Sequence, residues 1–138
     1  MQVPRRSAWA TVAVVVYMAS LVLPVSGVGW HECVPGIYCL LIGWLVPVPW
    51  SANVFLLIAG LSRPSKPRWA LLCALVAMFA GLTAHRMVPE LGVGFYVWMA
   101  SMVAMVIACA RSVVESDAPI AWARVRTWRR RDQNLIVR

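Results

Sequence analysis

The chain has 138 residues, of which 62% are hydrophobic and only 13% are charged, and its formal net charge is +8. This composition excludes an ordinary soluble domain, in which about a quarter of the residues are charged. The basic residues lie beside apolar runs rather than in a base-recognition motif, so membrane orientation explains them and we expect no nucleic-acid partner.

The first predicted element is an apolar helix over residues 9–24, which follows a short basic lead and ends at Pro24. This pattern predicts a first membrane span whose N-terminal side is cytoplasmic. A basic lead, an apolar core and small residues near Gly27 are also typical of a cleavable signal peptide. Both interpretations place residues 27–35 outside the cytoplasm.

The next apolar stretch is interrupted by Pro47 and Pro49. Neither of the runs beside these prolines reaches the roughly 20 residues that a spanning helix needs. Because prolines inside a helix would leave carbonyls unpaired in hydrocarbon, we predict a short outer helix, re-entrant or interfacial, over residues 36–46 and a second span over residues 48–62. The alternative is one kinked span, whose freed carbonyls Asn53 or a neighbouring helix would satisfy.

Two further spans are predicted, over residues 68–86 and 92–111, and a basic proline-containing turn precedes the first of them. Twelve of the 13 Lys and Arg residues lie in segments assigned to the cytoplasm, and only Arg86 lies outside them. By the positive-inside rule, both termini are cytoplasmic. We therefore predict an all-α integral membrane protein in which residues 1–111 form a domain of four transmembrane helices.

Residues 112–138 are predicted to form a basic cytoplasmic tail. A polar connector over residues 112–117 leads to a helix that begins near Pro119, with Asp117 as its cap. The apolar side chains of this helix share one face, and most of its arginines share the other. An amphipathic helix of this kind fits anionic lipids at the cytoplasmic surface, through Arg124, Arg126, Arg129, Arg130 and Arg131. The alternative is a positive-inside stop signal that continues into a disordered tail.

Cys33 and Cys39 lie six residues apart on the predicted outer side. An oxidising compartment would allow a disulfide between them, although two separate structural cysteines fit the sequence as well. His31, Glu32 and His85 lie at the same face. Since ligand pairs at the fixed spacing of zinc sites are absent, we interpret these residues as interfacial and predict neither a metal nor a cofactor.

Asn53 is a strongly polar side chain well inside an apolar run. Its amide can seal carbonyls freed by Pro47 and Pro49, or bond across to another helix. A polar residue within the membrane can also line a pore or a substrate path. The structural roles are the simpler interpretation, because a transporter ordinarily carries more such residues.

No Ser/His/Asp set, intramembrane acidic pair or phosphate-binding glycine loop is present, so an enzyme is the least supported class. We predict a non-enzymatic accessory or interaction protein. Its close helix contacts, with another copy or with a membrane-protein partner, would use Gly43, Gly60 and Gly81. The alternatives are an oligomeric pore or small transporter around the broken segment and, less favoured, an enzyme that uses His31, Cys33 and Cys39.

The segment from Gly43 to Asn53 resembles a group of small uncharacterised bacterial inner-membrane proteins. In that group, a GWL element is followed by a W-x-A-N element that opens a spanning helix. The matching residues here are Gly43, Trp44, Leu45, Trp50, Ala52 and Asn53. This chain has Val54 where the group has proline, and a shorter connection between the two elements. The resemblance implies a bacterial inner membrane and a multi-pass topology, and it brings no activity with it.

Overall fold

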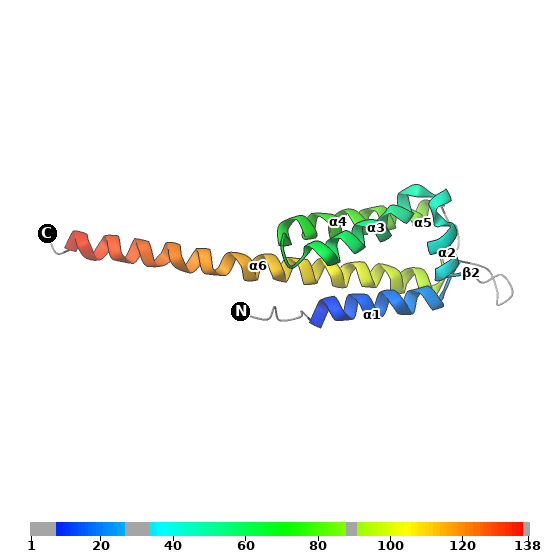
Figure 1. Ribbon diagram of the computed structural model, residues 1–138, viewed down its shortest axis with the longest axis horizontal. Helices are drawn as coiled ribbons and strands as arrows, with labels where there is room; N and C mark the ends of the chain where they lie inside the picture. The colour runs from blue at the N-terminus through cyan, green and yellow to red at the C-terminus, as the bar shows by residue number, and fades with distance from the viewer. Residues whose placement is uncertain (1–7, 27–33, 88–90, 137–138) are drawn as a thin grey trace.

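The computed structural model describes residues 8–26, 34–87 and 91–136, with side-chain surroundings in the last range described as far as residue 118. Most of this part of the chain is helical, and the helices lie roughly parallel to one long axis (Figure 1). The short helix α2 lies at one end of the bundle, which we call the α2 end. The helices are α1 (Ala8–Val22), α2 (Gly36–Ile42), α3 (Pro47–Ser62), α4 (Pro67–Leu82), α5 (Ala84–Met87) and α6 (Val93–Ile136).

The four long helices pack in the order α1, α6, α4, α3, each antiparallel to the next (Figure 1). By contrast, α1 and α3 are not packed along one another. Within the described residues, Pro67–Arg86 and Val93–Ala118 are long and apolar enough to cross a membrane. Helices α1 and α3 are also apolar but shorter, with 15 and 16 residues.

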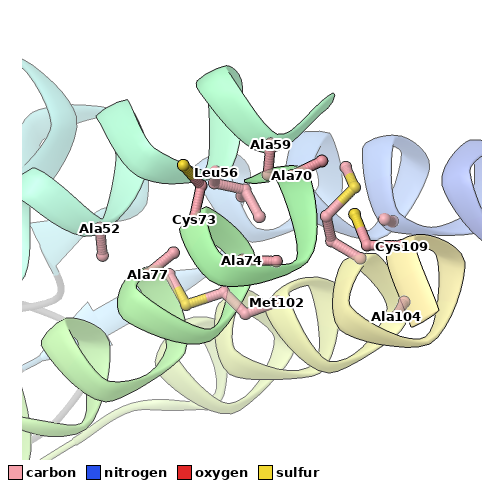
Figure 2. Close-up of a cluster of buried hydrophobic side chains, with 12 residues drawn as sticks. Ala52, Leu56, Ala59, Ala70, Cys73, Ala74, Ala77, Met102, Ala104 and Cys109 are labelled. Atoms are coloured by element: carbon pink, nitrogen blue, oxygen red, sulfur yellow. The ribbon is translucent and has the colours of Figure 1, made fainter. Parts of the chain in front are cut away.

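Small side chains dominate the interface of α3, α4 and α6 (Figure 2). Small residues let helix backbones approach closely, which is how helices associate where lipid removes the hydrophobic driving force. Both Cys73 and Cys109 are buried here. The buried cluster consists mainly of Ala52, Leu56 and Ala59 of α3, Ala70, Cys73, Ala74 and Ala77 of α4, and Met102, Met105 and Cys109 of α6.

The predicted break before the second long helix is confirmed, although α3 begins at Pro47 and not at residue 48. A 3₁₀ turn, η1 (Gly43–Leu45), separates α2 from α3. The N–H groups of the first helical turn have no acceptor inside the helix, so Pro47 and Pro49 forfeit no hydrogen bond there. The Trp50 N–H is the first to donate back, to the Val46 carbonyl at 3.3 Å. The prolines therefore start a helix and do not kink one.

A short antiparallel strand pair, which the sequence did not predict, ties the α2 end together. It joins β1 (Pro24–Ser26) to β2 (Val34–Pro35). The Gly36 N–H donates to the Leu23 carbonyl at 3.0 Å, and the Gly92 N–H donates to a β1 carbonyl at 2.7 Å. These bonds connect the end of α1 to the beginnings of both α2 and α6.

The predicted connector over residues 112–117 is wrong, because α6 runs unbroken to Ile136 and so passes through Pro119. Its 44 residues correspond to about 66 Å at the helical rise of 1.5 Å per residue. Within a helix, Pro119 costs one hydrogen bond, to the Glu115 carbonyl. Glu115 is exposed, so water can replace that bond. Beyond residue 118 only the backbone is described, and the surface role of Arg124, Arg126, Arg129, Arg130 and Arg131 stays a prediction.

Candidate functional site

A cavity of about 430 Å³ lies among α1, α2, α3 and α6 at the α2 end of the bundle. It occupies the region where α1 and α3 do not pack along one another. Its size and apolar wall are typical of a small-molecule site, and none of its lining residues in the described part of the chain is charged. Apolar lining residues include Leu21, Val25, Leu45, Val46, Leu91 and Phe95.

Asn53 lines this cavity and links three helices. Its Oδ1 accepts hydrogen bonds from the Tyr17 hydroxyl of α1 at 3.2 Å and from the Trp98 Nε1 of α6 at 3.0 Å. An indole N–H can only donate, so the Trp98 bond establishes which amide atom of Asn53 is the oxygen. Asn53 thus bonds across to other helices, the second of its two predicted structural roles, and it donates to no carbonyl of the described residues.

The Nδ2 group of Asn53 donates no hydrogen bond to the described part of the chain. The Ser20 hydroxyl, which also lines the cavity, donates to the Tyr17 carbonyl at 2.6 Å and forms no hydrogen bond with Asn53. The Trp50 indole is occupied by its bond to the Leu40 carbonyl at 2.9 Å. The Asn53 amide therefore offers unused N–H donors to an otherwise apolar cavity.

The bond from Trp50 to Leu40 attaches the first turn of α3 to α2. Gly43 lies against the same indole, and a Cβ added at Gly43 would approach the Trp50 Cδ1 to 2.8 Å. Gly43, Trp50 and Pro49 all line the cavity, whereas Pro47 does not. Gly43 therefore leaves space for the Trp50 ring, and this is the local reason for a glycine at the start of the GWL element.

Other residues singled out in the sequence lie elsewhere. His85 is exposed on α5 and does not line the cavity. Cys39 does line it; its side chain is exposed, and desolvation by the residues around it raises the pKa of this thiol. Cys33, like His31 and Glu32, lies outside the described residues, so the candidate disulfide to Cys39 stays a prediction. Within the described ranges, no three His, Cys, Asp or Glu side chains gather as metal ligands do.

Sequence reasoning missed Tyr17 and Trp98. Each has a polar group on an aromatic ring within an apolar helix, and such groups usually find a partner when they are buried. The available signal was therefore the presence of two donors in separate apolar helices and one amide acceptor in a third helix. The sequence did not show that the three helices place these groups together.

The site is suited to holding a molecule more than to transforming one. Its described wall combines apolar side chains with hydrogen-bond donors, and it lacks a nucleophile paired with a base. Comparison of the chain with protein-family models, curated proteins and solved structures finds no match.

Proposed function

We propose that this chain is a four-span bacterial inner-membrane protein that acts without catalysis, as an accessory protein that holds a neutral apolar molecule drawn from the bilayer. The observation that carries the proposal is the cavity of about 430 Å³ between α1 and α3, whose wall is apolar and uncharged over the residues that the structure describes. Lipid is the natural source of such a molecule, and we place its entry between α1 and α3.

The membrane setting is supported by the outward-facing surface of the bundle, which carries large apolar side chains on every long helix. In water, an apolar surface this extensive would drive association. Helices α1 and α3 have about 23 Å of helical rise each, so flanking residues and local thinning of the bilayer complete their spans. Examples of exposed apolar residues are Val15 and Met18 of α1, Leu57 and Leu61 of α3, Phe79 of α4 and Val103 of α6.

The charge distribution supports an orientation with both termini in the cytoplasm and the α2 end outside. On this arrangement, the basic C-terminal part of α6 lies against anionic lipids of the inner leaflet. A fluorescent protein that matures only in the cytoplasm, fused after Arg138, tests it. Fluorescence is expected, and a periplasmic location of the fusion would overturn the topology.

Two observations support a binding role over an oligomeric pore. The acceptor oxygen of Asn53 is engaged by Tyr17 and Trp98 of its own chain, which leaves no acceptor there to replace the hydration of an ion. The glycines expected to contact a partner face side chains of the same chain. Gly81 faces Met99 and Met102, and Gly60 faces Met105.

A pair of identical substitutions tests the proposal. Leu21→Trp adds volume inside the cavity, whereas Leu57→Trp adds the same volume on the exposed surface of α3. Native mass spectrometry of protein extracted gently from membranes should detect a bound apolar molecule on the wild type and on Leu57→Trp. Leu21→Trp should lose it. Equal retention by all three proteins, or the absence of any bound molecule, would overturn the proposal.

A further inference from the structure

We infer that the molecule held in the cavity carries a carbonyl oxygen within an otherwise apolar skeleton, and that this oxygen accepts a hydrogen bond from the Nδ2 of Asn53. The inference rests on the proposed function, since it names the chemical class of the ligand at the same site. Two membrane components offer this chemistry: the acyl ester of a glycerolipid and the ring carbonyl of a long-chain quinone.

The two ends of the Asn53 amide have different hydrogen-bonding roles. The Trp98 indole can only donate, so the atom it contacts at 3.0 Å is the Asn53 oxygen, and the Tyr17 hydroxyl adds a second bond to the same atom. The other end of the amide is therefore Nδ2, with two N–H donors. Both donors are left over once the bonds within the described part of the chain are counted.

The described wall around the Asn53 amide gives its Nδ2 group no hydrogen-bond partner. The polar side chains that line the cavity with it, those of Tyr17, Ser20, Tyr38 and Trp50, form no hydrogen bond with the Nδ2 group. An unpaired N–H in an apolar environment costs free energy, and within a bilayer there is little water to relieve that cost. An acceptor on the occupant of the cavity would remove it.

The part of the cavity wall that the structure describes is uncharged. Among its lining residues in the described ranges there is no lysine, arginine or acidic side chain, so a charged headgroup gains no partner from them. A neutral carbonyl satisfies the amide without bringing a charge into an apolar site. This selects a carbonyl within a greasy molecule over a carboxylate or a phosphate.

Two synthetic lipids that differ only at this group provide the test. A diacylglycerol and the corresponding dialkylglycerol diether share a neutral glycerol headgroup and chain length, but the diether lacks both carbonyls. The purified full-length protein is delipidated in a maltoside detergent and incubated with equal amounts of the two lipids. Native mass spectrometry then measures their retention. The wild type should retain the diester about three- to ten-fold over the diether, the effect of one neutral hydrogen bond.

Asn53→Leu should abolish the preference. Because this variant leaves Tyr17 and Trp98 without an acceptor, the variant Asn53→Leu/Tyr17→Phe/Trp98→Phe serves as a second version in which no donor is orphaned. In a parallel arm, a long-chain quinone replaces the diether as competitor. If the quinone displaces the diester from the wild type but not from the Asn53 variants, the carbonyl contact is supported and the quinone is identified as its source.

The two proposals fail in different ways. If the wild type retains both lipids equally and Leu21→Trp loses both, the cavity binds apolar chains and the carbonyl inference is overturned. If the wild type retains the diester preferentially and Asn53→Leu does the same, the donor is not Asn53 and the inference is again overturned. If neither lipid nor quinone is retained, the proposed function falls as well.

Discussion

The Trp98 Nε1 of α6 lies 3.0 Å from the Asn53 Oδ1 of α3, and this hydrogen bond joins two helices that are otherwise only lightly packed together. The Tyr17 hydroxyl reaches the same oxygen from α1. One amide thus holds three helices around the cavity, and the stability of the α2 end should depend on it.

Asn53→Leu is expected to lower the free energy of unfolding by about 1 to 2 kcal/mol. The substitution removes an acceptor and leaves the Tyr17 hydroxyl and the Trp98 indole unpaired in an apolar setting, which costs more than the loss of an average bond. Tyr17→Phe should cost less, because the Trp98 bond remains. Unfolding by SDS in mixed micelles measures both values.

The matched control for Asn53→Leu is Ser51→Ala, two residues away on the same helix. The Ser51 hydroxyl is exposed and donates only locally, to the Val48 carbonyl at 2.7 Å. Its loss should change stability little. If Ser51→Ala lowered the free energy of unfolding as much as Asn53→Leu, the effect would come from a change within helix α3 and not from the loss of hydrogen bonds to other helices.

Gly36→Ala is expected to destabilise the α2 end by about 1 to 3 kcal/mol, as overpacking does. A Cβ at Gly36 would clash with the Ser20 carbonyl, and backbone atoms cannot rotate away as a flexible side chain can. The Gly36 N–H also donates to the Leu23 carbonyl, so a shift would strain that bond. The midpoint of thermal unfolding in detergent measures the effect.

Gly60→Ala provides the comparison for Gly36→Ala. A Cβ at Gly60 would lie 3.7 Å from the Met105 Cε, an ordinary contact. Alanine also favours a helix over glycine by up to about 1 kcal/mol, so this variant should be neutral or slightly stabilising. Equal losses in the two variants would contradict the close approach at Gly36.

Local chemistry made much of the helical layout predictable. The prolines at Pro47 and Pro49 lack the N–H groups that a helix interior requires, and this property needs no knowledge of the rest of the fold. The same reasoning failed at Pro119, because a proline in an exposed helix loses only one bond and water can replace it. The rule is strict in hydrocarbon and weak where water reaches the carbonyl that loses its bond.

The cavity and the strand pair could not be predicted from the sequence, because each depends on segments that are separated in the chain. Asn53 was recognisable as a buried amide, but its partners Tyr17 and Trp98 come from the first and last long helices. Which helices leave a gap between them is decided by packing over the whole bundle. The hydrophobic periodicity of one segment does not reveal this packing.

Arg68 and Asp117 should contribute little to stability despite good geometry. The Arg68 Nη2 lies 3.0 and 3.2 Å from the two carboxylate oxygens, which ties the start of α4 to α6. The two side chains are 76% and 44% exposed, however, so water and salt screen the pair. A double-mutant cycle with Arg68→Met and Asp117→Asn should give a coupling of about 0.2 to 1 kcal/mol at low salt.

The salt dependence of this coupling is its internal control. At about 1 M salt the Debye length falls to about 3 Å, and the coupling should approach zero. A coupling that stays above 2 kcal/mol at high salt would mean that the pair is more shielded from solvent than its exposure indicates.

Cys39 should react with thiol reagents from the outer side, and only slowly at neutral pH. Desolvation raises the pKa of this thiol, so at any pH below that value the reactive thiolate is scarcer than in a free cysteine. In a Cys33→Ser variant, which removes the candidate disulfide, the rate of labelling by a membrane-impermeant maleimide should rise with pH. The rise should come at a higher pH than for a short peptide with the sequence around Cys39.

Labelling of the Cys33→Ser/Cys39→Ser variant gives the background, which should be low because Cys73 and Cys109 are buried. A rate profile for Cys39 that coincides with that of the peptide would contradict the desolvation of this thiol by the cavity wall. Labelling only after the inner membrane is opened would instead place α2 in the cytoplasm. The proposed orientation would then be wrong, and the cavity would draw its occupant from the inner leaflet.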